Sequence, residues 1–370
     1  MVLNRQTVGA ALIGIPVEIR EFLRWRRGRH SGDGCRVYYG FDRLPASNDV
    51  AGGGIIKTQD LQRAFPNCPN NANLLYLISS ALPSFAMTLA RRAKAAGAPF
   101  VLNQNGVFYA GWYGAGWQQQ NGPMRRLLAR ADHVFYQSQF CKSTADRFLG
   151  TPSASWEILH NPVDTATFAP PERAPACDRF SILLAGSHGA FYRAQLAVDT
   201  LALLRRRLPE ARLIIAGRCL WRPSEETALA EIRAHAADQG VLDAVEFTGP
   251  YSQAQALAVM HRAHVLLHTK YNDPCPRLVV EAMACGLPVV YSATGGVPEL
   301  VGEEAGIGIP GPLDYERDHP PSPELLAEAL ARVAAQREAY AQAARLRAVR
   351  HFDLGPWLER HRAIFERLSV

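Results

Sequence analysis

Residues 273–299, DPCPRLVVEAMACGLPVVYSATGGVPE, decide the fold class and raise the question of why two acids lie in a largely apolar segment. The stretch begins with an acid, Asp273, in a loop that two prolines interrupt. A second acid, Glu281, follows inside a segment that is otherwise apolar. Charged side chains are almost never fully buried unless they have a partner. We therefore interpret both acids as ligand-binding groups; a plain turn acid and a surface helix acid are the alternatives.

The neighbouring segments place these acids at the edge of a parallel sheet. Residues 264–269, HVLLHT, predict a strand, and the loop 270–276 leads from it to a helix that begins near Arg277. In open α/β sheets, ligands bind at the carboxyl ends of the strands. The amino end of a helix suits a phosphate, whereas carboxylates repel phosphate and accept hydrogen bonds from sugar hydroxyls. The sequence therefore predicts a pocket for a nucleotide sugar.

Strand and helix patterns alternate along the chain, which indicates βαβ units and parallel sheets. A length of 370 residues exceeds one ordinary core and favours two domains. The predicted fold class is α/β, with two Rossmann-like, doubly wound parallel-sheet domains and a cleft between them. The predicted parts are a basic amphipathic segment (1–34), a first domain (35–168), a proline-rich linker (169–178), a second domain (179–352) and a final helix (353–370) that returns to the first domain.

Composition narrows the functional class. The seven cysteines are scattered without CxxC spacing, which argues against a disulfide framework or a zinc site and favours a reducing compartment. A net charge of +6 favours anionic partners. A basic stripe interleaved with aromatic residues, typical of nucleic-acid binding, does not occur in the sequence. Acid clusters of metal-ligand type do not occur either, so we expect no metal and no cofactor.

The amino-terminal stretch 20–30, REFLRWRRGRH, has two interpretations. It is either a solvated first helix or an interfacial segment that docks on anionic lipid through Phe22, Leu23 and Trp25. The sequence has no apolar run of membrane-spanning length. We therefore expect a cytoplasmic protein, with peripheral contact at the inner face of the membrane under the second interpretation.

The opening stretch resembles the retaining glycosyltransferases of family 4, whose fold is named GT-B. Their signature is an acid, seven residues, then Glu, followed by Ala-Met-Ala-x-Gly-x-Pro-Val-Val. The matching residues are Asp273 (where Glu is usual), Glu281, Ala282, Met283, Ala284, Gly286, Pro288, Val289 and Val290. Upstream, residues 158–170 resemble the family's Asn-Gly-Val-Asp-x-x-x-Phe-x-Pro stretch, with Pro162 in place of Gly.

The resemblance implies roles for the residues around the two acids. Glu281 would accept hydrogen bonds from the nucleotide ribose, and Asp273 would hold hydroxyls of the donor sugar. The turn at Gly295 and Gly296 with Glu299 would form a second site for an anion or a hydroxyl. The backbone facing the sugar and the diphosphate would come from Cys275, Pro276, Arg277 and Leu278.

The family also places two basic residues after the first strand of the second domain, where they neutralise the leaving diphosphate. Here that region reads AGSHGAFYRAQ. Ser187, after Gly186, stands where Arg is usual, and Arg193 would replace the usual Lys, since a guanidinium binds phosphate well. His188 is either structural or a further lining residue.

In the first domain, the stretch 51–57, AGGGIIK, resembles the family's glycine loop, with an ordinary helix start as the alternative. The loop would bind a phosphate or the acceptor through Gly52, Gly53, Gly54 and Lys57. Asn105 lies where the family often has a His, and it would position the acceptor without acting as a base. The aromatic run 107–117 is either core or a loop that stacks on the acceptor.

These observations predict a hexosyltransferase-type enzyme of the EC 2.4 class. It would transfer a sugar, with retention of configuration, from a nucleoside diphosphate sugar to a glycan, lipid-linked or small-molecule acceptor, as in polysaccharide biosynthesis. The predicted catalytic residues are Asp273, Glu281, Arg193 and Asn105. Two alternatives stay open: a nucleotide-sugar 2-epimerase, which needs no acceptor, and a catalytically silent nucleotide-sugar-binding protein.

Overall fold

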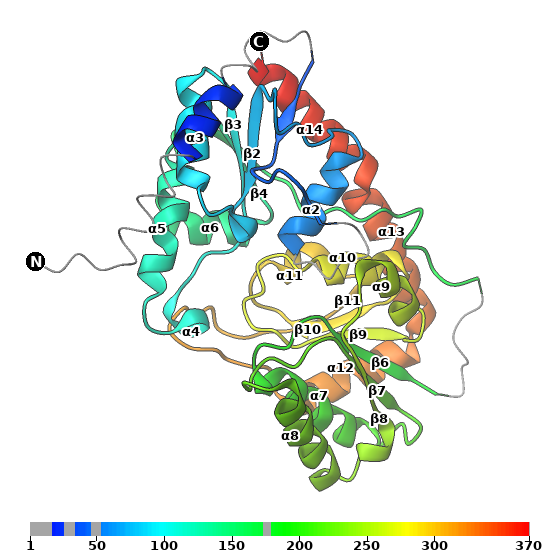
Figure 1. The fold of residues 1–370 in the computed structure, drawn as a ribbon. Helices are drawn as coiled ribbons and strands as arrows, with labels where there is room; N and C mark the ends of the chain where they lie inside the picture. Colours follow the sequence, from blue (N-terminus) through cyan, green and yellow to red (C-terminus); the bar gives the residue numbers. More distant parts are fainter. Residues whose placement is uncertain (1–16, 26–33, 46–52, 173–178, 370) are drawn as a thin grey trace, which may run out of the picture.

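The computed structural model describes residues 17–25, 34–45, 53–172 and 179–369, which form two α/β domains that face each other (Figure 1). The first domain holds a five-stranded parallel sheet and the second a six-stranded parallel sheet. The predicted pair of Rossmann-like domains is therefore confirmed. Gly52, one of the predicted loop residues, lies outside the described residues.

The first sheet runs in chain order. Its strands are β1 (Val37–Tyr38), β2 (Leu74–Ile78), β3 (Phe100–Gln104), β4 (His133–Tyr136) and β5 (Ser155–Ile158). Strands β2, β3 and β4 are buried on both faces, which explains why they read as continuous apolar runs. The prediction of a doubly wound sheet is wrong for the described strands of the first domain, since they have no reversal of order. Alternating βαβ units predict parallel pairing but do not determine the order of the strands.

Helices cover both faces of the first sheet. One face packs against α3 (Ala86–Ala95), α5 (Trp117–Leu128) and α6 (Gln139–Phe148). The short helix α4 (Ala110–Tyr113) precedes α5, and the 3₁₀ turn η1 (Ser79–Ala81) follows β2. The other face packs against α2 (Gly53–Gln62) and the carboxy-terminal helix.

The second sheet has the reversal of strand order that defines a doubly wound sheet. Its order is β11 (Gly306–Ile309), β10 (Val289–Ser292), β9 (Val265–His268), β6 (Ser181–Ala185), β7 (Arg212–Ala216) and β8 (Val245–Gly249). The order reverses between β6 and β9, so the carboxyl ends of these two strands form the switch point where ligands bind in such folds. The loop that carries Asp273 follows β9.

Two helical layers enclose the second sheet. One layer contains α9 (Gln253–Met260), α10 (Arg277–Ala284), α11 (Val297–Val301) and α13 (Arg337–Phe352). The other contains α7 (Phe191–Leu204), α8 (Glu225–Asp238) and α12 (Pro323–Ala335), and the 3₁₀ turn η2 (Leu242–Ala244) follows α8. Residues 323–352 have one continuous helical pattern in the sequence, but the helix is interrupted at Gln336, because α12 packs on α7 whereas α13 packs on α10.

The last helix, α14 (Leu354–Ser369), lies against the first domain (Figure 1). Its apolar side chains, among them Trp357 and Phe365, join the core on the face of the first sheet that α2 also covers. The Tyr76 hydroxyl lies 3.0 Å from His361 Nε2, which ties β2 to α14. The chain therefore crosses between the domains a second time.

Residues 17–25 form a helix at the amino-terminal end of the described chain. Trp25 is 1% exposed and packs edge-on against Tyr38, so it belongs to the core and is not available to a lipid surface. Ile19, Phe22 and Leu23 are exposed. None of the helices in the described residues is both long enough and apolar enough to span a bilayer.

Candidate functional site

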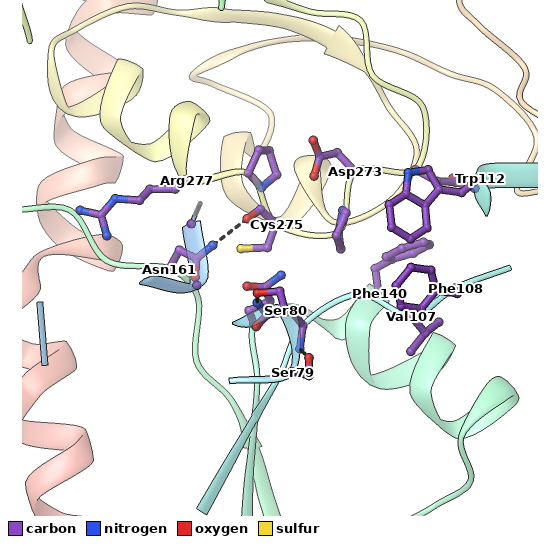
Figure 2. Close-up of a pocket in the computed structure, with 18 of the residues that line it drawn as sticks. Ser79, Ser80, Val107, Phe108, Trp112, Phe140, Asn161, Asp273, Cys275 and Arg277 are labelled. Atoms are coloured by element: carbon purple, nitrogen blue, oxygen red, sulfur yellow. Dashed lines mark hydrogen bonds between the residues drawn. The ribbon is translucent and has the colours of Figure 1, made fainter. Parts of the chain in front are cut away.

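Two cavities open between the domains, at the carboxyl ends of the strands. The first has a volume of about 480 Å³ and is lined by both domains, whereas the second, of about 360 Å³, lies mainly in the second domain. Figure 2 shows the first cavity, with Asp273 and Cys275 on one wall and Ser79 and Ser80 on the other. The residues that line both cavities are Gly53, Lys270, Asp273, Pro276 and Arg277. We refer to these five residues as the junction.

The second cavity brings together most of the residues that the sequence predicted for donor binding. It lies beside the carboxyl ends of β6 and β9, at the amino end of α10. The predicted residues that line it are Gly186, Ser187, Arg193, Asp273, Pro276, Arg277, Leu278 and Glu281.

Asp273 is buried at the junction and is held by two basic side chains. Its Oδ2 lies 3.1 Å from His268 Nε2 and 3.2 Å from Lys270 Nζ. Burial opposes ionisation, but the Lys270 ammonium and the hydrogen bond from His268 outweigh it and hold the pKa of the Asp273 carboxyl well below its usual range. Burial lowers the pKa of His268, so a carboxylate faces one ammonium and one neutral imidazole at neutral pH.

The loop that carries Asp273 depends on a close approach of two glycines. The Gly296 N–H donates to the Asp273 carbonyl at 2.9 Å. A Cβ on Gly295 would lie 2.5 Å from that carbonyl oxygen, and a Cβ on Gly296 would lie 1.9 Å from the Pro274 carbonyl oxygen. Neither glycine lines either of the two cavities. Their role in the structure is therefore to let the loop pack closely.

Glu281 lies one turn inside α10 and is buried. Its Oε1 accepts hydrogen bonds from Gln253 Nε2 at 2.7 Å and from Arg277 Nε at 2.6 Å. No described residue donates to Oε2, which leaves that oxygen for hydroxyls of a ligand. Arg277 also forms an ion pair with Asp60 of α2, across the domain boundary.

Arg193 is buried in the first turn of α7. Its Nη1 donates to the Ser187 carbonyl at 2.6 Å, and its Nε is buried without a hydrogen-bond partner among the described residues. Burial lowers the pKa of Arg193, and the nearby Asp273 carboxylate opposes this shift. A buried guanidinium with an unpaired N–H on a cavity wall is suited to a phosphate.

Besides Gly295 and Gly296, two further predicted residues, His188 and Glu299, lie away from both cavities. The His188 ring is fully buried with Nε2 3.1 Å from the Ala216 carbonyl, and burial lowers the pKa of His188 to about 3. The Glu299 carboxylate accepts the backbone N–H groups of Gln139 and Phe140 at 2.7 and 2.9 Å. Glu299 therefore caps α6 of the first domain from the second domain.

The first cavity contains the predicted residues of the first domain. Gly53, Gly54, Lys57 and Asn105 all line it. Lys57 is fully buried, and its ammonium donates to three amide oxygens: Asn103 Oδ1 at 2.8 Å, Gln137 Oε1 at 3.1 Å and Asn105 Oδ1 at 3.3 Å. Burial lowers the pKa of Lys57 to about 8.

The aromatic run 107–117 is divided between the core of the first domain and the wall of the first cavity. Val107 and Tyr109 are buried in the core of the first domain. Trp112 is 52% exposed and stacks on Phe108, with ring centroids 4.9 Å apart. Both rings line the first cavity, and Figure 2 places Trp112 at one end of it.

Cys275 lines the first cavity through the loop before α10. Its carbonyl accepts a hydrogen bond from Asn161 Nδ2 at 2.7 Å, which joins this loop to the first domain. Burial raises the pKa of the Cys275 thiol, so the thiol stays protonated. Within the described ranges, no group of three or more His, Cys, Asp and Glu side chains could hold a metal ion.

Several residues of the site were not predicted from the sequence. His268 and Lys270 contact Asp273, and Gln253 contacts Glu281. Lys270 had a usable signal, because it is one of four lysines in the chain and is the second residue after β9. Gln253 had none, since it contacts Glu281 only through the tertiary fold, and the sequence does not distinguish His268 from an ordinary residue at the end of a strand.

Comparison with known proteins agrees with this arrangement. Residues 178–346 match the family described as glycosyl transferases group 1. Among curated relatives, the D-inositol 3-phosphate glycosyltransferase of Mycobacteroides abscessus is 32% identical over 198 residues, which cover 50% of this chain and 42% of the relative. The corresponding enzyme of Streptomyces bingchenggensis is 27% identical over 206 residues, which cover 52% of this chain and 45% of the relative. The chain thus spans less than half of the length of these relatives.

Solved structures share the fold over more of the chain. Anabaena HepE in complex with UDP-glucose has a TM-score of 0.65 at 20% identity, over 84% of this chain and 82% of its own. The sucrose-phosphate synthase of Thermosynechococcus elongatus has a TM-score of 0.64 at 18% identity, over 84% and 76%. The predicted GT-B fold is therefore confirmed. The match of residues 178–346 to glycosyl transferases group 1 supports the resemblance to family 4 in the second domain.

Proposed function

We propose that this protein is a retaining glycosyltransferase that moves a sugar from a nucleoside diphosphate sugar to an acceptor in the first cavity. The observation that carries the proposal is the junction. A donor in the second cavity would extend its sugar to the same five residues that an acceptor in the first cavity would reach. A transferase needs two substrates to meet at one point, whereas an epimerase or a binding protein does not.

The donor would bind in the second cavity through three kinds of contact. The free Oε2 of Glu281 would accept hydrogen bonds from the ribose hydroxyls. The amino end of α10 and the unpaired Nε of Arg193 would bind the diphosphate. Asp273, at the junction, would accept hydrogen bonds from hydroxyls of the donor sugar.

The reaction needs little from the protein beyond positioning and charge. The bond between the anomeric carbon and the diphosphate oxygen breaks, and its electron pair stays on that oxygen. The acceptor oxygen bonds to the anomeric carbon on the same face, and its proton passes to the leaving phosphate. Arg193 stabilises the charge that develops on the diphosphate. Asn105 has an amide that can position the acceptor but cannot remove its proton.

The first cavity fits an acceptor with hydroxyl groups and an apolar or ring-shaped face. Trp112 and Phe108 offer flat surfaces, and Ser79, Ser80 and Asn105 offer hydrogen-bonding groups. A glycan, a lipid-linked sugar or a small glycoside would meet these demands. The curated relatives that match part of the chain carry inositol 3-phosphate in their names, which adds this compound to the acceptors to be tested.

A donor panel tests the proposal. HepE was solved with UDP and with UDP-glucose, so UDP sugars come first, followed by GDP and ADP sugars. Proton NMR of each incubation, with and without acceptors, separates three outcomes. Transfer or slow hydrolysis of the donor with retained anomeric configuration supports the proposal. Formation of the 2-epimer without an acceptor identifies an epimerase, and tight binding without turnover identifies a silent binding protein.

We also propose peripheral contact with anionic lipid at the inner membrane face. The exposed Ile19, Phe22 and Leu23 on the helix of residues 17–25 support it, and Arg20 lies among them. Sedimentation with vesicles of phosphatidylglycerol and phosphatidylcholine tests this proposal. Salt should weaken the binding of the wild type to these vesicles, and the double variant Phe22→Ser with Leu23→Ser should lose this binding. Equal binding by the wild type and the double variant would rule this contact out.

A further inference from the structure

We infer that Lys270 is a catalytic residue that binds the leaving diphosphate together with Arg193. This inference rests on the proposed function and adds a residue that the resemblance to family 4 does not supply. The family's first basic position is Ser187 in this chain, so the pair of cations expected beside the diphosphate lacks one member. Lys270 supplies the second cation from a different loop.

Lys270 lies where the leaving group has to be. It belongs to the junction and therefore lines both cavities. Its side chain is 31% exposed, and its Nζ lies 3.2 Å from Asp273 Oδ2. It follows β9 by two residues, at the strand order reversal where the second sheet binds ligands.

Two hydrogen bonds fix Lys270 beside Arg193. The Thr269 hydroxyl donates to the Arg193 carbonyl at 3.1 Å, and the Tyr271 N–H donates to the Tyr192 hydroxyl at 3.0 Å. The residues before and after Lys270 are thus both bonded to the first turn of α7. The backbone that carries Lys270 is therefore held against the start of α7, which carries Arg193, although the two residues are 77 positions apart in sequence.

The cations of Lys270 and Arg193 both face the carboxylate of Asp273, and Asp318 also interacts with Lys270. His268 is neutral because burial lowers its pKa. A diphosphate would therefore bring negative charge to two cations that, among the described residues, have no full ion pair of their own apart from the one between Lys270 and Asp273. Arg277 is already paired with Asp60 and Glu281. Arg218 also lines the second cavity, but its side chain is half-exposed and its Nε lies 3.7 Å from Glu225 Oε2.

Binding of the donor would exchange the partner of Lys270. Its ammonium would leave the Asp273 carboxylate and donate to a phosphate oxygen, and Asp273 would stay bonded to His268. The freed carboxylate oxygen could then accept a sugar hydroxyl. In the reaction Lys270 keeps its proton: the electron pair of the broken bond stays on the diphosphate, and the acceptor's proton goes to the phosphate. Lys270 contributes only its positive charge, which stabilises the phosphate as that group becomes more negative.

The test compares Lys270→Met and Lys270→Arg with wild type and with Lys94→Met, a control on α3 whose ammonium pairs with Asp132. Titration calorimetry measures affinities for the pairs UDP and UMP, GDP and GMP, and ADP and AMP. For the base that binds, we expect Lys270→Met to weaken the diphosphate about 10-fold and to leave the monophosphate unchanged. The kcat with the matching donor sugar should fall about 100-fold, with partial recovery in Lys270→Arg.

The outcomes separate this inference from the proposed function. If wild type binds none of the nucleotides, both proposals fall. If wild type binds and turns over its donor and Lys270→Met matches it, only the role of Lys270 falls. Equal loss of diphosphate and monophosphate affinity in Lys270→Met would also overturn it, because a misfolded loop predicts that result. Asp273→Asn, which keeps Lys270, should preserve the preference for diphosphate over monophosphate.

Discussion

Asp60 of α2 and Arg277 of α10 form a buried ion pair that joins the two domains across the cleft. The same guanidinium donates to Glu281 at 2.6 Å. The proposed ribose ligand is therefore connected to the first domain through one side chain. This arrangement couples the shape of the donor site to the position of the domains.

Arg277→Met should lower the melting temperature by several degrees. The substitution leaves two buried carboxylates, Asp60 and Glu281, without their cation, and breaking one buried ion pair costs about 3–5 kcal/mol. Differential scanning calorimetry measures the effect. The control is Arg63→Met, just past the end of α2, which removes an ion pair with Asp164 that is half-exposed on the arginine side and should cost about 0–1 kcal/mol. Equal shifts for both variants would show that the Arg277 bridge does not stabilise the fold.

Glu299→Ala should reduce stability without weakening nucleotide binding. Glu299 accepts two N–H groups at the start of α6 and lies outside both cavities, and loss of a helix cap costs about 0.5–2 kcal/mol. The exposed Glu303→Ala serves as the control. Thermal unfolding and titration with UDP check both halves of the expectation. A loss of UDP affinity with an unchanged melting temperature would contradict this expectation and would support the donor-binding role that the sequence predicted for Glu299.

Lys57→Met should change stability in a pH-dependent way. Burial lowers the pKa of Lys57 from 10.5 to about 8 in the folded protein. Below pH 8 both folded and unfolded chains hold the proton, so the full cost of the buried charge is present. Above pH 8 the folded protein releases the proton first, and the cost falls as the pH rises towards 10.5.

The wild type should therefore gain stability relative to Lys57→Met between pH 7 and pH 9.5, by on the order of 2 kcal/mol. The three amide partners are the same at both pH values, so this comparison isolates the charge. Urea unfolding at the two pH values provides the measurement, with Lys94→Met as the control for loss of a surface ammonium. A constant difference between wild type and Lys57→Met would mean that Lys57 keeps its proton throughout.

Turnover should not require a divalent metal ion. Arg193, Lys270 and the amino end of α10 supply the positive charge that a metal would otherwise bring to the diphosphate. Assays with and without EDTA, followed by addition of magnesium or manganese, decide this point. Activity that EDTA abolishes and either ion restores would contradict it.

The local sequence predicted the parts of the fold that depend on periodicity and turn chemistry. The apolar strands, the loop before Arg277 and the position of Glu281 one turn inside α10 follow from patterns within about 20 residues. The break at Gln336 and the order of strands in the first sheet do not, because they depend on which surfaces pack together. The same limit applies to the site.

The sequence identified residues of the site but did not predict which residues contact them. The sequence identified Asp273, but its partners His268 and Lys270 are set by how the loop folds back on β9. Glu299 matched a family position, yet it contacts α6 of the other domain, 160 residues away in the chain. The contact of Glu299 depends on domain packing, which no local spacing encodes.

The two acids of the donor site are expected to divide their roles, with Glu281 binding the nucleotide and Asp273 binding the sugar. Titration calorimetry with the free nucleoside diphosphate, on wild type, Glu281→Ala and Asp273→Ala, tests this division most directly. Removing a buried hydrogen-bond acceptor costs about 1–3 kcal/mol, so Glu281→Ala should weaken binding about 10-fold or more. Asp273→Ala should bind the nucleotide nearly as wild type does and lose turnover of the donor sugar instead. Loss of nucleotide affinity in Asp273→Ala with normal affinity in Glu281→Ala, or normal affinity and turnover in both, would contradict the division of roles.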